Sequence, residues 1–224
     1  DLRCSYITGL QLQNYEAYGN VYMNLNETLT STLRSHSIDK LASKYPNADW
    51  ENVFSKGQLE SKSWLVDKLL HWDVDLGIVY ICGGWYGQLA SMLFISKLPI
   101  IRIYSYDIDS FCTQIANDMN SFKYVNRFMA ITEDIHNLDY NKCDTIINTS
   151  CEHIKNFSDW YDNIPDNKLL VLQSNNFNEL EEHVNCVNSL EEFKQQCYIS
   201  NLLYSGELEI NVAGYTRYML IGRK

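Results

Sequence analysis

Residues 78–91 decide the fold of this chain, and they read Ile78-Val79-Tyr80-Ile81-Cys82-Gly83-Gly84-Trp85-Tyr86-Gly87-Gln88-Leu89-Ala90-Ser91. The stretch opens with a short apolar run that predicts a buried parallel strand. Its glycines predict a turn, and apolar residues at helical spacing follow that turn. Glycine lets the backbone approach a ligand closely, and the start of a helix offers free N–H donors. This order of elements predicts a site for a nucleotide cofactor.

The length and composition limit the class of protein. A chain of 224 residues with 46% hydrophobic residues predicts one domain with a full core and a small appendage. No apolar run reaches the roughly 18–20 residues that span a bilayer, and no secretory signal is visible. We therefore expect a cytoplasmic protein without a membrane partner.

The charge and the cysteines bear on its partners. Lys and Arg number 18 against 28 Asp and Glu, a net charge of −10, which counts against nucleic acid as the main partner. The 7 cysteines include no C-x-x-C pair, which argues against a zinc ribbon or a disulfide scaffold. Most lie in apolar stretches and are interpreted as small core residues in a reducing compartment.

The first part of the chain predicts a helical extension, residues 1–54, before the main domain, residues 55–224. A helix is expected over residues 26–45, ending at Pro46. The tyrosines before it suit either a lid over a small ligand or packing against the domain, and these are Tyr6, Tyr15, Tyr18 and Tyr22. A second helix reaches about His71, with Gln58, Ser61 and Lys62 on one side. That side is either a solvated face or a contact with the polar end of a cofactor.

The rest of the chain alternates strands with helices. Strands are expected at 78–82, 100–106, 127–131, 143–148 and 168–172, and helices at 110–120 and 189–198. Two longer alternating runs, about 198–211 and 214–222, predict an antiparallel hairpin. The pattern predicts an α/β fold with a doubly wound, mostly parallel, Rossmann-like sheet. Polar clusters follow the strands at their carboxyl ends, where such sheets bind ligands.

These residues resemble the class I S-adenosylmethionine-dependent methyltransferases over about residues 55–224. Gly83, Gly84 and Gly87 match the glycine-rich first motif, with Trp85 inside it. By this resemblance Asp107, followed by Ile108, holds the ribose hydroxyls, and Asp134 contacts the adenine amino group. Asn148 opens the segment after the fourth strand, where the methyl acceptor and the catalytic groups gather. More narrowly, the chain looks like small methyltransferase-like proteins of bacterial viruses, which implies a viral protein in the host cytoplasm.

The chain also departs from the family pattern. The family has a carboxylate two residues before the first glycine, and here that place is Ile81. The amino acid end of S-adenosylmethionine is therefore expected to be held differently, by the helix that carries Gln58 and Lys62. The N-P-P-Y motif of amino-methylating enzymes is absent. The glycine turn by itself also fits a nicotinamide or flavin dinucleotide, or a purely structural turn. Asp109 is interpreted as a helix cap.

Glu152 and His153 are the best pair for acid–base chemistry, because a histidine titrates near neutrality and a carboxylate can orient it or raise its pKa. On an extended segment Cys151 and His153 would share one side, but no further ligands at metal spacing are evident, so no metal is expected. His153 could equally be a structural loop histidine. Asn175, Asn176 and His183 are candidates for the acceptor pocket.

The sequence thus predicts an S-adenosylmethionine-dependent methyltransferase with a small-molecule acceptor. Two alternatives stay open: another reaction of the same cofactor, such as aminocarboxypropyl transfer or a lyase reaction, and a non-catalytic binding module on this fold.

Overall fold

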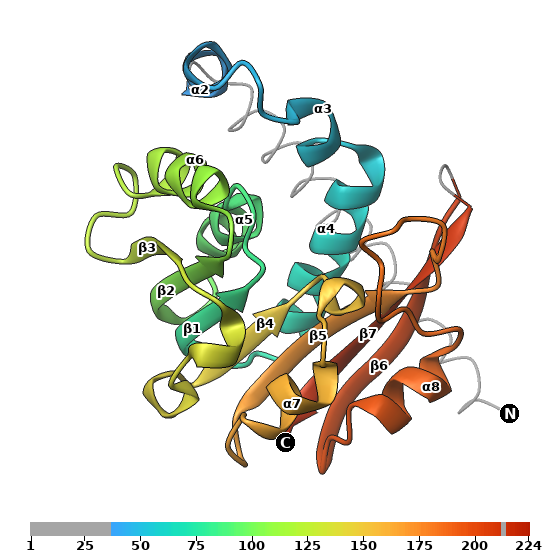
Figure 1. The fold of residues 1–224 in the computed structure, drawn as a ribbon. Coiled ribbons are helices and arrows are strands. Elements are labelled where there is room, and N and C mark those ends of the chain that lie inside the picture. The colour runs from blue at the N-terminus through green and yellow to red at the C-terminus, as the bar shows by residue number, and fades with distance from the viewer. Residues whose placement is uncertain (1–36, 212–213) are drawn as a thin grey trace, which may run out of the picture.

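The computed structural model describes residues 37–211 and 214–224, and Figure 1 shows their fold. The strands of this part form one mixed sheet in the order β3-β2-β1-β4-β5-β7-β6. The first five strands pair in parallel, and β7 pairs antiparallel with both β5 and β6. In chain order the strands are β1 (Gly77–Cys82), β2 (Ile100–Asp107), β3 (Phe128–Thr132), β4 (Thr145–Asn148), β5 (Leu169–Asn175), β6 (Asn201–Ile210) and β7 (Tyr215–Arg223). The predicted doubly wound sheet with its closing hairpin is confirmed.

Helices cover both faces of this sheet (Figure 1). The α-helices are α2 (Ser37–Lys44), α3 (Trp50–Val53), α4 (Lys56–His71), α5 (Gln88–Ile95), α6 (Ser110–Asn120), α7 (Phe157–Asp162) and α8 (Leu190–Gln196). Short 3₁₀ turns are η1 (Ile135–Asn137), η2 (Tyr140–Lys142) and η3 (Cys151–His153). One buried cluster joins α4, α5 and α6 to the sheet, and a second joins α7 and α8 to the other face. No helix in the described ranges is long and apolar enough to cross a membrane.

The sequence explains how these elements form. In α4, Leu65 and Leu69 lie one helical turn apart and are fully buried, as predicted. The helix begins after Ser55, whose hydroxyl accepts a hydrogen bond from the backbone N–H of Gln58 at 3.4 Å. In β7 the side chains alternate between the two clusters: Met219 and Ile221 belong to the first, and their neighbour Leu220 to the second. Local periodicity therefore assigns each element to its layer.

The structure corrects some of the predicted bounds. Strand β5 continues to Asn175 instead of ending at 172, because Gln173, Ser174 and Asn175 pair with β7. The short helices α3 and α7 were not predicted. The expected N-terminal helix is seen only as α2, because residues 1–36, with the four tyrosines, lie outside the described residues. The boundary between residues 54 and 55 stays a prediction.

Candidate functional site

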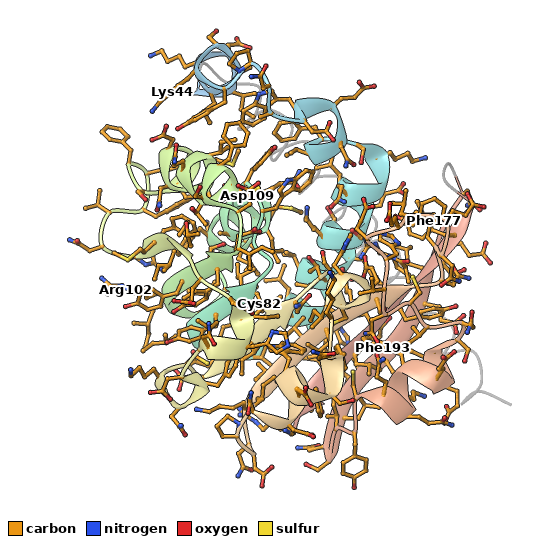
Figure 2. The ribbon with its side chains drawn as sticks, viewed as in Figure 1. Lys44, Cys82, Arg102, Asp109, Phe177 and Phe193 are labelled. Carbon is orange, nitrogen blue, oxygen red and sulfur yellow. The ribbon has the colours of Figure 1, made fainter. Side chains whose placement is uncertain are left out.

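The candidate site lies at the carboxyl ends of the parallel strands. The strand order reverses between β1 and β4, which are neighbours although two strands separate them in sequence. Beyond these ends the loops diverge to opposite faces, and open α/β sheets bind ligands there. Figure 2 labels Cys82, the last residue of β1, and Asp109, which precedes α6, and both lie near the middle of the molecule.

The glycine turn after β1 has the backbone that its sequence predicts. Gly83 has a φ of +70° and Gly87 a φ of +78°, a region that favours glycine. A Cβ atom on Gly84 would lie 1.8 Å from the Ser105 hydroxyl oxygen, so this residue must be glycine for the turn to pack on β2. At Gly83 a Cβ atom would meet nothing within 4 Å. The turn is thus packed on one side and open at Gly83.

Asp107 connects this turn to the end of β2. One oxygen of its carboxylate accepts the backbone N–H of Trp85 at 2.9 Å, and the other accepts that of Asp109 at 3.0 Å. Burial raises the pKa of Asp107 above its ordinary value, although these hydrogen bonds oppose the shift. Asp109 caps α6 by accepting the backbone N–H of Phe111 at 2.8 Å, which confirms the predicted cap. Asp109 therefore has the capping role that the sequence predicted, and the ribose role of Asp107 stays a prediction.

Lys62 approaches the glycine turn from α4. Its ammonium donates hydrogen bonds to the side-chain oxygens of Gln58 and Gln88, each at 2.7 Å, and lies 5.7 Å from the centre of the Trp85 ring. Among the described residues it forms no ion pair with a carboxylate. Lys62 is buried, and burial, assisted by the charge of Arg217, lowers its pKa to about 7. Among the described residues this buried amine therefore bonds only to neutral amides and has no counter-charge.

Two further predicted residues lie at the outer edge of the site. Ile108 follows Asp107 and is 76% exposed, so its apolar side chain is available to a flat ligand. Asp134 follows β3 and is also exposed. One of its oxygens accepts the backbone N–H of His136 and also contacts the His136 ring, both at 2.9 Å. These contacts lower the pKa of Asp134. The structure does not test its adenine role.

The segment after β4 is a 3₁₀ turn and not the extended chain assumed from the sequence. Asn148 ends β4 and accepts the backbone N–H of Ser150 at 2.7 Å, which starts this turn. Because successive residues in a 3₁₀ turn point about 120° apart, Glu152 and Cys151 are buried while His153 is exposed. The predicted pairing of Cys151 with His153 on one side was wrong.

The turn brings together residues that are distant in sequence. Asn175 donates a hydrogen bond to one oxygen of Glu152 at 2.6 Å, and Arg217 lies 3.5 Å from the same oxygen. The rings of His153 and His183 meet edge to face, with centroids 4.5 Å apart. Loss of hydration lowers the pKa of His153, because it has a larger effect than the charge of Glu152, which acts to raise that pKa. Asn176 instead bonds the backbone of Thr216 on β7.

The sequence did not single out Gln88 and Arg217. Gln88 is the first residue of α5 and is buried, with its side-chain nitrogen bonded to the Val53 carbonyl at 2.6 Å. Arg217 is buried and donates to the Thr149 carbonyl at 2.8 Å. It stands two residues before Met219 and so lies on the same buried face of β7, and a charged residue in that otherwise apolar alternation is the signal that could have revealed it.

Several buried polar atoms near this turn make no hydrogen bond to any described residue. They are Glu152 Oε2, Gln173 Oε1, Ser174 Oγ and Arg217 Nε. Buried polar groups are normally paired, so an unpaired group calls for a ligand, a water or an ion. Two surface depressions of about 420 and 510 Å³ lie elsewhere, and the first is at the amino ends of the strands, around Gly77 and Asp144. The unpaired polar atoms, in contrast, lie at the carboxyl ends of the strands.

Comparison with solved structures gives the fold. The chain is similar to the Burkholderia thailandensis 1,6-didemethyltoxoflavin-N1-methyltransferase, solved with 1,6-didemethyltoxoflavin and S-adenosylhomocysteine, at 12% identity and a TM-score of 0.61 over 83% of this chain and 86% of that one. The N-methyltransferase NodS from Bradyrhizobium japonicum, in complex with S-adenosylhomocysteine, matches at 12% identity and a TM-score of 0.61, covering 84% and 99%. The chain has the Rossmann-like methyltransferase fold.

The magnesium protoporphyrin IX methyltransferase from Synechocystis, solved with bound S-adenosylmethionine, matches at 15% identity and a TM-score of 0.55, covering 86% of this chain and 94% of that one. No protein-family profile matches the sequence, and no curated protein is similar to it. At such identities the likeness establishes the fold, and the activity has to be argued from the residues.

Proposed function

We propose that this protein binds S-adenosylmethionine at the carboxyl edge of its sheet and transfers the methyl group to a small-molecule acceptor. The observation that carries the proposal is the placement of Asp107 beside the glycine turn. Its carboxylate holds the backbone of Trp85, and the turn is open at Gly83. In a fold whose solved neighbours hold S-adenosylmethionine or S-adenosylhomocysteine, this corner suits a ribose and its adenine.

The residues fit the two ends of this cofactor. Asp107 has acceptor capacity left for ribose hydroxyls, since a carboxylate accepts about four hydrogen bonds and the neighbouring backbone N–H groups do not use them all. The exposed Ile108 side chain suits an adenine face, and Asp134 is proposed for the adenine amino group. At the other end, Lys62 and Gln58 are proposed to hold the amino acid part, with the Lys62 ammonium facing its carboxylate.

Lys62 would also account for Ile81, which stands where the family pattern has a carboxylate. The usual carboxylate of the first motif, which the resemblance leads one to expect there, is missing. A buried ammonium with no anionic partner among the described residues offers the opposite charge at this end. We therefore propose that the cofactor's carboxylate, and not its amine, dominates recognition at this end.

The sulfonium of S-adenosylmethionine supplies an activated methyl group, so the chain has mainly to position the acceptor and exclude water. Glu152 and His153 are proposed for the acceptor side. His153 is held neutral at physiological pH by its lowered pKa, so its ring can take up a proton that the acceptor loses. The net charge of −10 supports a small-molecule acceptor over nucleic acid.

Calorimetric binding of S-adenosylmethionine and S-adenosylhomocysteine tests the proposal, with Asp107→Ala as the affected variant. Loss of hydrogen bonds to a charged group costs about 1.5–3 kcal/mol, so we expect affinity to fall about 10- to 100-fold. Asp109→Ser, which keeps a capping oxygen, is the matched control and should bind normally. Absence of binding at millimolar ligand would contradict the proposal, as would tight binding of a nicotinamide or flavin dinucleotide.

Product analysis then tests the reaction. Incubation with methyl-labelled S-adenosylmethionine and pooled small metabolites should give a labelled acceptor and S-adenosylhomocysteine. Release of methylthioadenosine instead would mean that a different carbon–sulfur bond breaks, and methyl transfer would be rejected.

A further inference from the structure

A cluster of two histidines and a carboxylate lies on the acceptor side of the site. Glu152 and His153 come from η3, and His183 comes from the loop between β5 and α8. One ligand atom of each residue lies within 4.8 Å of those of the other two. Figure 2 labels Phe177 in the same loop, and its carbonyl bonds to His183. The cluster therefore combines two adjacent residues after β4 with one residue from the loop that follows β5.

We propose that Glu152, His153 and His183 bind one divalent first-row transition metal ion, such as Zn²⁺ or Fe²⁺. Two imidazole nitrogens and one carboxylate oxygen are ligands that these ions prefer, whereas Mg²⁺ and Ca²⁺ prefer oxygen ligands alone. Three protein ligands leave further coordination positions open for a bound molecule. The proposal concerns metal binding and does not depend on the cofactor assignment.

The Glu152 carboxylate is the first independent support. Glu152 is 1% exposed, and one of its oxygens is bonded to Asn175 and lies near Arg217. Its other oxygen, Oε2, has no partner among the described residues. A buried carboxylate oxygen without a partner is costly, and a bound cation removes that cost. The contacts to the first oxygen resemble the outer hydrogen bonds that orient metal ligands.

The His183 ring gives the second support. Its Nδ1 lies 2.5 Å from the Phe177 carbonyl oxygen, and because a carbonyl only accepts, Nδ1 carries the proton. The other ring nitrogen, Nε2, then keeps a free lone pair. Metal-binding histidines are commonly fixed in this way by a backbone carbonyl.

The geometry needs only small adjustments. A single ion about 2.1 Å from each ligand atom requires those atoms to lie no more than about 4.2 Å apart, against the observed limit of 4.8 Å. His153 is exposed, so rotation of its ring closes the difference without moving the core. Cys186 is not included, because its thiol lies against oxygens of Phe177 and Asn175 and against the Nδ1 side of the His183 ring, at 3.8 Å, which is the nitrogen that the Phe177 carbonyl already holds.

The inference gives His153 a ligand role in place of the proton acceptor proposed above. If the methyltransferase proposal also holds, the ion would stand on the acceptor side, where it can bind an acceptor oxygen and lower the pKa of its hydroxyl. That consequence rests on the proposed function, and the binding site itself does not.

The test uses the full chain, stripped of metal by a chelator, and titrates it with ZnCl₂ by calorimetry and with CoCl₂ by visible absorption. We expect one Zn²⁺ per chain and the ligand-field bands of cobalt in a low-symmetry nitrogen and oxygen site. His183→Gln and Glu152→Gln should weaken Zn²⁺ binding at least about 10- to 100-fold, since even outer partners of metal ligands cost that much. MgCl₂ should not compete.

Two control variants accompany these. His71→Ala removes a histidine at the far end of α4, and Cys186→Ser removes the nearest thiol, and both should keep wild-type affinity. Absence of Zn²⁺ binding by the wild type, or equal binding by His183→Gln and His71→Ala, would overturn the inference, as would a thiolate-to-cobalt band lost in Cys186→Ser. His183→Gln tests the site even where Glu152→Gln fails to fold. Binding of S-adenosylhomocysteine, measured on the same samples, separates failure of the metal site from failure of the cofactor site.

Discussion

Lys62 on α4 and Gln88 at the start of α5 are joined by a hydrogen bond of 2.7 Å between the lysine ammonium and the glutamine side-chain oxygen. The contact ties the long helix to the glycine turn and holds a buried cation beside Trp85. Because Gln88 is also bonded to the Val53 carbonyl, three separate segments fix the position of this ammonium. The first predictions concern this arrangement.

Lys62→Met should weaken binding of S-adenosylhomocysteine about 10- to 100-fold, because it removes a charge-assisted hydrogen bond worth about 1.5–3 kcal/mol. Methionine keeps the length and packing of the aliphatic stem. Calorimetry measures the change, and Lys68→Met, on the same helix but bonded to Asp67, should bind normally. Equal affinities for the two variants would remove Lys62 from the cofactor site.

The affinity should also depend on pH. Lys62 has a pKa of about 7 in the folded protein, against 10.5 ordinarily, so above pH 7 the free site is neutral and must take up a proton to hold a carboxylate. Affinity should fall up to about tenfold per pH unit above about 7, and the binding enthalpy should vary with buffer ionisation. Lys62→Met should lack this fall in affinity above pH 7. If the affinity of that variant depends on pH as the wild type's does, the assignment of Lys62 is wrong.

The lowered pKa of Lys62 has the opposite effect on the stability of the ligand-free protein: as pH rises, ligand affinity falls while the free energy of unfolding increases. The unfolded chain keeps the lysine proton up to about its ordinary pKa of 10.5, while the folded site loses it near 7. The contribution of Lys62 to the free energy of unfolding therefore rises between about pH 7 and 10.5. Denaturation curves measured across this range should therefore show the free energy of unfolding of the wild type increasing with pH relative to that of Lys62→Met.

Gly84→Ala should destabilise the turn, because its Cβ atom would lie 1.8 Å from the Ser105 hydroxyl oxygen. Overpacking of this kind costs about 1–3 kcal/mol, and cofactor affinity should fall with it. The double variant Gly84→Ala with Ser105→Ala removes that oxygen and should recover most of the lost stability in urea denaturation. Without such recovery, the clash with Ser105 is not the cause.

Glu152→Ala should lower the free energy of unfolding by about 3–5 kcal/mol, because it leaves the buried Arg217 without its counter-charge. Glu182→Ala, at an exposed position nearby, should change it little. Chemical denaturation measures both. A small effect of Glu152→Ala would mean that Arg217 finds compensation elsewhere.

The sequence by itself determined the layers of this protein. Glycines with positive φ, apolar runs of five or six residues and helical spacing are local properties, so the strand–turn–helix at residues 77–95 and the cap at Asp109 could be predicted from their own neighbours. The order of the strands placed Asp107 and Asn148 at one edge, because parallel strands share their carboxyl ends.

Only the tertiary structure decided which side chains meet at that edge. His183 joins Glu152 and His153 from a loop 30 residues further along the chain, and Arg217 arrives from β7. The segment at residues 151–153, expected to be extended, is a 3₁₀ turn in which Cys151 and Glu152 are both buried and His153 is not. Local patterns carry no information on contacts between loops of different strands, because those depend on how the packed layers position the loop ends.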